Sequence, residues 1–515
     1  MPTVDPVELA HLEWMIENKE KELLAILDAR NYYNGVQQDF VPAAMKDILS
    51  QHKSKGNVFA LNVCESIVMA VANVLEIVGF DTDETADENG VKPQAAWANM
   101  VWKANHMAAV QDIVHEGALS DRESFVIVDW NDQTKIPKFV HNEVYIPLQS
   151  SGDGGQGVWM VYENDDRFQT ALYAVKRWVE TTWERGGPIK TSRITFYFDD
   201  RIEKFQLDFG DAGMSKITNG DEPFPLPRVD AQSNPLGIPA IHFHNKGYRS
   251  EHWKAIPMQD AINRTLADIL YAIDLVSKKS FLGFGFHPTT DGKAKKTDNS
   301  NALTIGAGVL NTIPDKAPGE ASLQEIEGED PRPTIEALIS LITLTAQITD
   351  TPVSRFIVTA QIASDDTIKA QNDALDKKAE DRRGLFGEAW KQTMNMARKY
   401  ANAYGGAGLD ESVEFIPLWR HDVTLQELEQ KKTMLGIPDE QVWTEAGYSS
   451  DKIVEMKSQQ SYRIAQERAI WEGAMSATQN IPLDEYLKRC GLSAEEIAEI
   501  NVSIENQTAV PLTDL

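Results

Sequence analysis

The segment Gln259-Asp260-Ala261-Ile262-Asn263-Arg264-Thr265-Leu266-Ala267-Asp268 lies inside an apolar repeat that predicts one long helix from Trp253 to Ser280. A second, shorter apolar helix is predicted from Thr334 to Thr349. Helices this apolar are not expected to stay exposed on a soluble monomer. They pack either between copies of the chain or inside one copy, and we expect the packing between copies. The residues expected to make it are Ile262, Leu266, Ile269, Ile273, Leu338 and Ile342.

The segment between these helices, Phe281 to Pro331, differs from both because it is rich in glycine, proline and charge. Its glycines do not form a nucleotide-binding loop, since Gly283-x-Gly285 lacks a third glycine and Gly292-Lys293 is followed by Ala294. We expect a docking surface here, because opposite charges in one segment can pair between subunits or with a partner. An ordinary solvated loop is the alternative. The expected docking residues are Lys293, Lys295, Lys296, Glu325, Glu327 and Glu329.

The chain is predicted to leave the second helix at Asp350-Thr351-Pro352, because the residue before a proline avoids the helical conformation. A loop to Ala363 follows. Ser364 is expected to cap a long helix that continues to Tyr404. A strand is expected from Val413 to Leu418.

The N-terminal half mixes helical and alternating patterns. Helices are predicted over Val7 to Ala29, Val58 to Val78 and Trp97 to Leu119. Strands are predicted over Phe125 to Val128, Phe139 to Val140, Val144 to Ile146, Arg193 to Phe198, Lys204 to Leu207 and Ala240 to Asn245. The fold class predicted from these patterns is α+β, mainly helical.

Composition and charge exclude several classes of protein. The 515 residues contain 42% hydrophobic and 25% charged residues, which excludes a disordered or fibrous chain. No run reaches the ~20 apolar residues that a membrane span needs. Two cysteines, Cys64 and Cys490, cannot form a disulfide framework or a zinc site. The net charge of −28 would repel nucleic acid, so any role with DNA must use local contacts or exploit repulsion.

Candidates for catalysis are few. His242 and His244 share one side of a predicted strand and could ligate a metal, and Asp199-Asp200 sit in a predicted hairpin turn. No Cys-x-x-Cys or His-Glu-x-x-His motif accompanies them. A cytosolic multidomain enzyme of unidentified chemistry is therefore the alternative hypothesis, with these four residues as its only candidates.

The order of the parts resembles the portal proteins of tailed bacteriophages, of the siphophage type. Four stretches carry the resemblance over about residues 8 to 420. They are Tyr32-Tyr33-x-Gly35 with the following helix from Asn62 to Phe80, Leu236-Gly237-Ile238-Pro239-Ala240-Ile241-His242-Phe243-His244-Asn245, the segment from Gln259 to Asp268, and the run from Leu341 through Thr351-Pro352 to Phe386-x-x-Ala389-Trp390.

The resemblance implies a ring of typically twelve subunits at one capsid vertex, through which double-stranded DNA passes during packaging and ejection. It implies a portal fold with an α/β wing (1–252), a stem (253–280 and 332–349), a clip (281–331), a tunnel loop (350–363), a long wing helix with a closing strand (364–420) and a helical crown (421–515). The chain would occupy the virion, and the host cytoplasm during assembly. It would have no catalytic activity, cofactor, metal or membrane contact of its own, since a separate terminase motor hydrolyses ATP.

The resemblance also implies partners and contact residues. The partners are further copies of the chain, DNA bound without sequence specificity, the major capsid protein, the terminase large subunit, the head–tail adaptor and a scaffolding protein. The clip would dock the terminase and then the adaptor. The tunnel loop would touch DNA through Thr351, Ser354, Arg355, Thr359 and Gln361, with Arg355 as its one cation.

The C-terminal region carries a weak internal repeat with a period of about 44 residues. Trp443, Gly447 and Ser449 recur as Leu487, Gly491 and Ser493. Each copy is predicted to be a helix, a glycine stop, a serine cap and another helix. The acidic second helices make a DNA-reading motif improbable.

Overall fold

The computed structural model of the chain describes residues 20–38, 40, 61–87, 91–146, 156–163, 170–184, 187–207, 214–216, 228–230, 232–277, 280–284, 289–290, 293–294, 310–313, 322–326, 330–357 and 365–420, with 443, 453 and 455–456. The chain divides into two units, Met1–Glu84 with Trp97–Asp422, and Thr85–Ala96 with Val423–Leu515. Every described strand lies in the first unit. The C-terminal repeat and nearly all of the expected crown fall outside the described residues.

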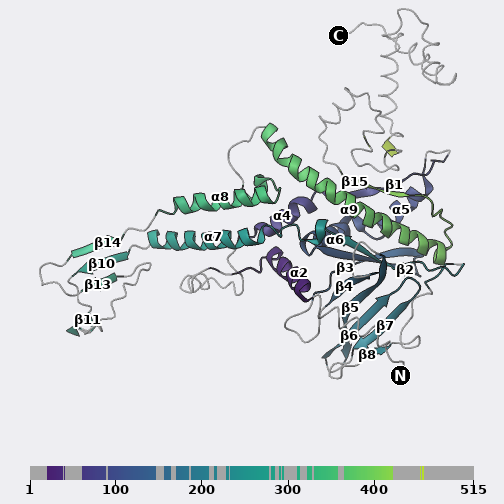
Figure 1. The fold of residues 1–515 in the computed structure, drawn as a ribbon, viewed down its shortest axis with the longest axis horizontal. Helices are drawn as coiled ribbons and strands as arrows, with labels where there is room; N and C mark the ends of the chain where they lie inside the picture. The colour runs from purple at the N-terminus through teal and green to yellow at the C-terminus, as the bar shows by residue number, and fades with distance from the viewer. Residues whose placement is uncertain are drawn as a thin grey trace, which may run out of the picture. The chain divides into compact units, whose positions relative to one another are not determined.

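A three-stranded antiparallel sheet lies at the centre of the first unit (Figure 1). Its middle strand, β2 (Glu123–Asn131), pairs with β3 (Ile136–Glu143) and with β9 (Ala240–His244). The predicted strands at Phe125 to Val128, Phe139 to Val140 and Ala240 to Asn245 are thereby confirmed. The first six residues of β2 are all buried, because the sheet packs against α6 (Met107–Ser120) and α9 (Asp365–Gly405).

The core under this sheet is aromatic. The side chains of Trp390 and Phe386 on α9 are fully buried. The Trp390 ring lies 4.7 Å from that of Phe243 on β9 and 4.9 Å from that of Trp102, both edge to face. Aromatic pairs in this geometry add to the stabilisation from burial alone. The Phe386-x-x-Ala389-Trp390 stretch therefore attaches the long helix to the sheet.

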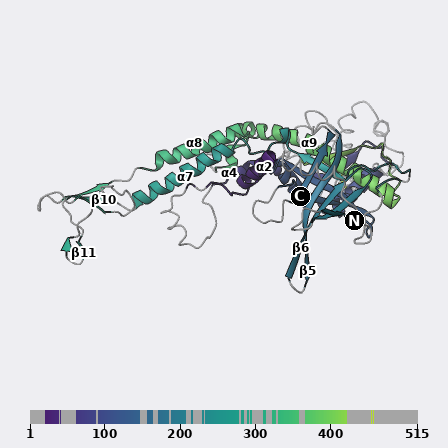
Figure 2. The same cartoon turned by 60° about the horizontal axis from the view of Figure 1, so that its bottom comes forward.

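A second sheet has five antiparallel strands in chain order. The strands are β4 (Gly157–Tyr162), β5 (Ala171–Glu184), β6 (Gly187–Tyr197), β7 (Ile202–Leu207) and β8 (Met214–Lys216). The predicted strands at Arg193 to Phe198 and Lys204 to Leu207 form the β6–β7 hairpin. Figure 2 shows β5 and β6 as a long hairpin that projects beyond its neighbours. Val144 and Ile146 make only isolated bridges to this sheet.

Two predicted helices are wrong in extent. The helix expected over Val58 to Val78 is α4 (Val63–Ala72), and Ile77 and Phe80 belong instead to strand β1 (Ile77–Thr82). β1 pairs with β15 (Phe415–Trp419), which is the strand expected near Val413 to Leu418. A continuous apolar run fits a buried strand as well as a buried helix.

The helix expected over Trp97 to Leu119 is two helices, α5 (Pro93–Ala104) and α6. His106 separates them in the left-handed conformation, at φ 54°. The helix expected to end at Ala29 is α2 (Glu20–Tyr33), and the chain turns at Gly35, whose φ is +73°. A left-handed glycine there ends the helix at little conformational cost.

The two long apolar helices are confirmed as α7 (Ile256–Ser277) and α8 (Arg332–Ile348), which lie side by side (Figures 1 and 2). The segment between them contains a small sheet in the order β13 (Leu310–Ile313), β10 (Ser280–Phe284) and β14 (Ser322–Ile326). β10 pairs with β13 in parallel and with β14 antiparallel. A two-stranded ribbon of β11 (Thr289–Thr290) and β12 (Lys293–Ala294) also belongs to this segment.

The long helix predicted from Ser364 to Tyr404 is α9, of 41 residues. It ends at Gly405, and Gly406 follows with a φ of +63°, as expected of a glycine stop. Ser364, the expected cap, lies outside the described residues. Among the described helices, none is long and apolar enough to cross a membrane.

Candidate functional site

The base of α7 is held by a network of buried amide side chains. Gln259 accepts a hydrogen bond from the Val63 backbone N–H at 2.9 Å and donates to the Leu61 carbonyl at 2.6 Å. Asn263 donates to the Gln37 amide oxygen at 2.6 Å. Buried polar groups are costly unless they are paired, so this network fixes the position of α7 against α4.

The same network explains two of the sequence motifs. The Tyr32 hydroxyl donates to Asp260 at 2.8 Å, and Asn62 donates to the Tyr33 carbonyl at 2.8 Å. The Tyr32-Tyr33-x-Gly35 stretch and the Gln259–Asp268 stretch therefore meet in space. Both stretches position the root of the paired helices, which is the start of α7 together with the end of α8.

A buried ion cluster lies at the same root. Glu251, in the turn that leads into α7, is 2.9 Å from Lys378 Nζ and 2.8 Å from Arg382 Nη2, both on α9. Lys378 also donates to the Thr349 carbonyl at the end of α8, at 2.6 Å. Burial alone would raise the pKa of Glu251, but Lys378 and Arg382 outweigh that effect and hold the pKa below its usual value. The cluster ties α7, α8 and α9 together.

Backbone and side-chain hydrogen bonds close the turn after α8. Asp350 adopts a left-handed backbone conformation, at φ 50°, and the Thr351 N–H donates to the Ala346 carbonyl at 3.0 Å. Thr351, expected to face DNA, is only 5% exposed, and its hydroxyl donates to the Thr349 carbonyl at 3.2 Å. Thr351 therefore stabilises the turn and presents little surface to a ligand.

The expected tunnel loop begins with a short 3-10 helix, η3 (Val353–Arg355). Ser354 and Arg355 are exposed, and Phe356 packs back against Ile342 and Val63. Within the described part of the chain, the Arg355 guanidinium forms no ion pair. Thr359 and Gln361 lie outside the described residues.

The apolar stripe of α7 is buried near the start of the helix and exposed near its end. Ile262 is fully buried and Ile269 is 6% exposed, whereas Ile273 and Val276 on the same stripe are 46% and 47% exposed. Leu266 is half-buried. Residues spaced by three and four share a helix face, so one continuous stripe extends past the point where the chain itself covers it.

The apolar residues of α8 fall on two flanks. Ile342 is 5% exposed and packs with Leu338 against α7 and α4. Beside this covered face, Ile335 and Ile339 lie on one flank, 37% and 46% exposed. Leu344 and Ile348 form the other flank, 49% and 40% exposed. No residue from Ala337 to Ile348 is charged.

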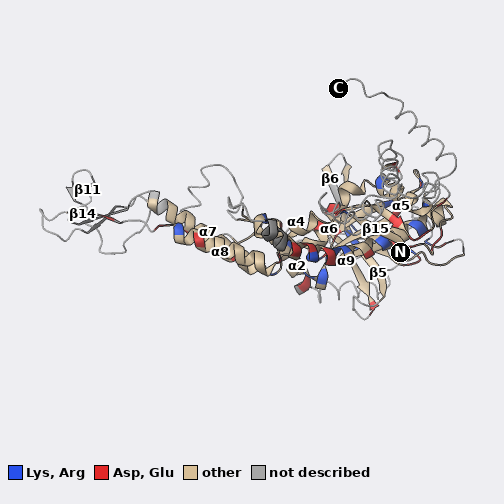
Figure 3. Ribbon diagram, turned by 90° about the horizontal axis from the view of Figure 1, so that it is seen from above, with Lys and Arg blue, Asp and Glu red and all other residues tan. Residues whose placement is uncertain are grey.

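A polar strip runs between the two flanks of α8. Its members recur at intervals of three and four residues and therefore share one face. They are Glu336, Ser340, Thr343 and Gln347. Figure 3 shows that the charged residues gather on the body of the unit, while α7 and α8 carry few. The paired helices thus present bare apolar flanks beside a nearly neutral polar strip.

The expected docking residues are only partly described. Glu325 lies on β14 and is exposed, and Lys293 lies on β12. Lys295, Lys296, Glu327 and Glu329 lie outside the described residues. Whether opposite charges pair in this segment stays a prediction.

Two of the four candidates for catalysis, His242 and Asp200, make contacts within the fold. His242 Nδ1 lies 2.7 Å from the Tyr162 hydroxyl, and its ring stacks on Phe125 at 4.8 Å. Asp200 lies in the β6–β7 turn and pairs with Arg201 at 3.1 Å. Among the described residues, no three His, Cys, Asp or Glu side chains are grouped to hold a metal ion. Cys64 is fully buried in the core.

Two buried histidines predict a loss of stability in mild acid. Trp390 donates to His115 Nε2 at 2.8 Å, so the ring is neutral and its Nδ1–H donates to the Leu75 carbonyl at 3.0 Å. Burial lowers the pKa of His115 and that of His252 from 6.5 to about 4. The unfolded chain therefore takes up these protons first as the pH falls.

We expect the free energy of unfolding to drop by roughly 1.5 kcal/mol per histidine between pH 6.5 and 5. Urea denaturation at both pH values measures the drop. The variant His115→Gln should show about half of it. An identical drop in that variant would contradict the assignment to His115.

These features define a class of protein. Exposed apolar flanks on an ordered, otherwise charged protein indicate a subunit whose flanks become buried when it assembles with other subunits. The family model described as phage portal protein, SPP1 Gp6-like, matches residues 12–433. The chain belongs to this family. A comparison with curated proteins finds no match.

Membership confirms the resemblance seen in the sequence and favours it over the enzyme hypothesis. Phage portal proteins are structural proteins of the capsid vertex that assemble as oligomers and contact capsid components. The residues that hold the root of the helices, Glu251, Lys378 and Arg382, were not expected from the sequence. Their spacing along the chain gives no signal, because Glu251 and Arg382 are 131 residues apart.

Proposed function

We propose that the chain forms a closed ring, of twelve subunits as the family resemblance suggests, that conducts double-stranded DNA during packaging and ejection. The observation that carries the proposal is the pair of bare apolar flanks on α8. A subunit in a ring touches its two neighbours through different surfaces. One flank faces one neighbour, and the other flank with the outer stripe of α7 faces the next.

The polar strip of α8 then faces the axis of the ring. Gln347 offers neutral hydrogen bonds, and Glu336 repels phosphate. The hydroxyls of Ser340 and Thr343 donate to carbonyls one turn back and add neutral polar surface. Several cations per subunit would bind phosphates tightly enough to hinder sliding. Arg355, just past the end of α8, supplies a single cation per subunit. This arrangement steers DNA and lets it move.

The other parts take the roles implied by the resemblance. Residues 1–252 and 364–420 form the wing, 253–280 and 332–349 the stem, and 350–363 the tunnel loop. The clip of residues 281–331 docks the terminase and the head–tail adaptor, using its opposite charges. Residues 421–515 form the crown. The sheet of β10, β13 and β14 gives the clip an ordered centre.

Adding cations to the strip tests the conduit. The double variant Ser340→Lys/Gln347→Lys is expected to form normal rings but to package DNA at least tenfold more slowly at low salt in a purified packaging reaction. The reason is that each added phosphate contact strengthens binding and is weakened again by salt. Raising the salt concentration should therefore restore the rate.

The control variant Ser340→Gln adds length without charge and should package normally. Native mass spectrometry of every variant reports the ring. A wild-type chain that stays a compact monomer or dimer would contradict the ring. An unchanged packaging rate in the lysine variant at low salt would contradict the placement of the strip in the channel.

A further inference from the structure

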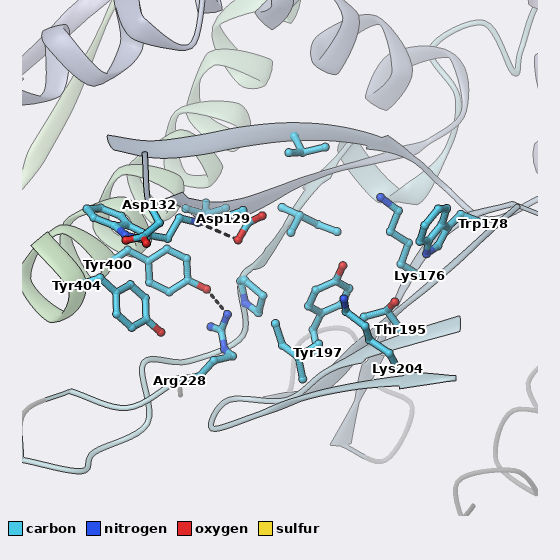
Figure 4. A pocket seen from close by; sticks show the side chains of 16 residues that line it. Asp129, Asp132, Lys176, Trp178, Thr195, Tyr197, Lys204, Arg228, Tyr400 and Tyr404 are labelled. Carbon is cyan, nitrogen blue, oxygen red and sulfur yellow. Dashed lines mark hydrogen bonds between the residues drawn. The ribbon is translucent and has the colours of Figure 1, made fainter. Parts of the chain in front are cut away.

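A pocket of about 590 Å³ lies between the two sheets, far in sequence from the stem. Its walls come from β2, from β5, β6 and β7, and from the last turns of α9 (Figure 4). Pockets of this size hold a small molecule or a few residues of an extended peptide. The wing thus contains a built cavity that neither ring assembly nor a DNA channel uses.

Several hydrogen-bond donors that line the pocket have no partner among the described residues. Arg228 is 3% exposed, and its Nε has no hydrogen-bond partner within the described part of the chain. The same is true of the buried Nε1 of Trp130. Lys176 and the Tyr197 hydroxyl also line the pocket without a hydrogen bond among the described residues. Unsatisfied buried donors are uncommon, and an acceptor bound in the pocket would satisfy these.

The cations are held in place by the protein. The terminal nitrogens of Arg228 donate to the Tyr400 hydroxyl and to the Gly237 carbonyl. Figure 4 shows Lys176 on one side of the pocket and Arg228 with Asp129 on the other, with Tyr197 between them. Burial lowers the pKa of Lys176, although Asp129 opposes that effect. An anionic group between Lys176 and Arg228 would relieve the cost of burying both.

The chemistry of the walls favours a carboxylate over a phosphate. Arg228 already donates from both terminal nitrogens, to the Tyr400 hydroxyl and the Gly237 carbonyl, so fewer of its N–H groups remain for the paired contacts through which arginine usually binds phosphate. Asp129 would repel a dianion, but it can accept hydrogen bonds from the backbone of a peptide. Trp130 and Trp178 add aromatic surface for an apolar neighbour. Double-stranded DNA is too wide for this pocket.

We propose that this pocket binds an extended peptide segment of a partner protein through one Asp or Glu side chain, held between Lys176 and Arg228 beside an apolar residue. Lys176 and Tyr197 contact the carboxylate. Trp178 packs on the apolar residue. The wing therefore carries a peptide-docking site that is separate from the stem and the clip.

Affinity selection from synthetic peptides tests this site. The probes are two acetylated, amidated tetrapeptide mixtures with Glu or Gln fixed at the second position and apolar or aromatic residues elsewhere. The wild-type protein should retain the Glu mixture at least tenfold better than the Gln mixture. Lys176→Met should abolish that preference, and Lys103→Met, on exposed α5 surface, should keep it.

A second measurement uses the wild-type protein and so does not depend on how the Lys176→Met variant folds. The Glu mixture should protect Lys176 of the wild-type protein from acetylation, read by mass spectrometry, and leave Lys103 unprotected. Equal retention of both mixtures, or equal retention by the wild type and Lys176→Met, would overturn the proposal. Stronger retention of a third mixture with phosphoserine at the fixed position would overturn the choice of a carboxylate.

Discussion

The double variant Ile273→Asp/Ile339→Asp is expected to yield folded monomers where the wild-type chain yields rings. Both side chains are 46% exposed on the single chain, so a carboxylate at either position stays hydrated in the monomer. In the assembled state each position would be buried against a neighbour. Losing the apolar contact costs about 1.5–3 kcal/mol per site, and burying the charge costs more. Association should weaken at least a thousandfold.

Sedimentation velocity measures whether the variant forms rings or monomers. Far-ultraviolet circular dichroism measures whether the monomers stay folded. The matched control is Gln347→Asp, which places the same charge on the polar strip of α8 and should leave the rings intact. The contrasting variant is Ile262→Asp, which should unfold the chain because Ile262 is fully buried inside it. Rings that survive the double variant would show that these flanks are not the subunit interface.

The contrast between Ile262 and Ile273 shows how far the sequence could predict this site. Apolar spacing identified the stripe on α7 and its length, since that spacing depends only on the helical period. It could not tell which part of the stripe the chain covers for itself. That depends on α4 and on the segment after α8, which fold back only onto the base of the helices. Ile262 and Ile342 are therefore packed within the chain, and Ile273 is left for a neighbour.

The errors in the N-terminal half have a different cause. The apolar pattern predicts a helix where β1 forms, because the partner strand β15 lies more than 300 residues away and pairing at that distance leaves no local pattern. His106 interrupts a helical pattern without a glycine or proline to signal the break. By contrast, Asp350-Thr351-Pro352 ended α8 as expected, because the proline acts on its immediate neighbour.

The four stretches that carried the family resemblance are mainly structural in the described chain. Asn62, Gln259 and Asp260 hold the root of the helices, while Phe243 and Trp390 attach α9 to the sheet. Their order along the sequence predicted the family because it specifies how the stem is fixed to the wing. Of the surfaces proposed to contact DNA and neighbouring subunits, Leu344, Gln347 and Arg355 lie within the fourth stretch, whereas Ile273, Ile335 and Ile339 lie outside all four.

The variant Glu251→Gln is expected to lower the free energy of unfolding by roughly 3–5 kcal/mol, because it leaves two buried cations without their counter-ion. Glu251 is 8% exposed, and its partners Lys378 and Arg382 are similarly buried. Gln keeps the shape of the side chain, including the position where Asn245 donates to it at 3.1 Å. The expected loss of stability therefore comes from the removed charge and not from a cavity.

The chain offers a matched control for this variant. Glu380→Gln removes the same charge from the same region of α9, where Glu380 pairs with Arg383 at 3.2 Å but is 68% exposed. Exposed pairs contribute little, so this change should cost less than about 1 kcal/mol. Urea denaturation of both variants at pH 7.5 measures the difference.

The position of the cluster makes a further distinction possible. Lys378 holds the last carbonyl of α8 and Glu251 precedes α7, so losing the charge should loosen the root of the stem before the core of the wing. Hydrogen exchange at Thr349 and Thr351 should accelerate at least tenfold in Glu251→Gln, while exchange in β2 changes less. Adding Lys378→Met to Glu251→Gln should recover at least 1 kcal/mol, because it removes one of the unpaired cations. Equal destabilisation by Glu251→Gln and Glu380→Gln, with unchanged exchange at Thr349, would mean that the cluster does not hold the stem to the wing.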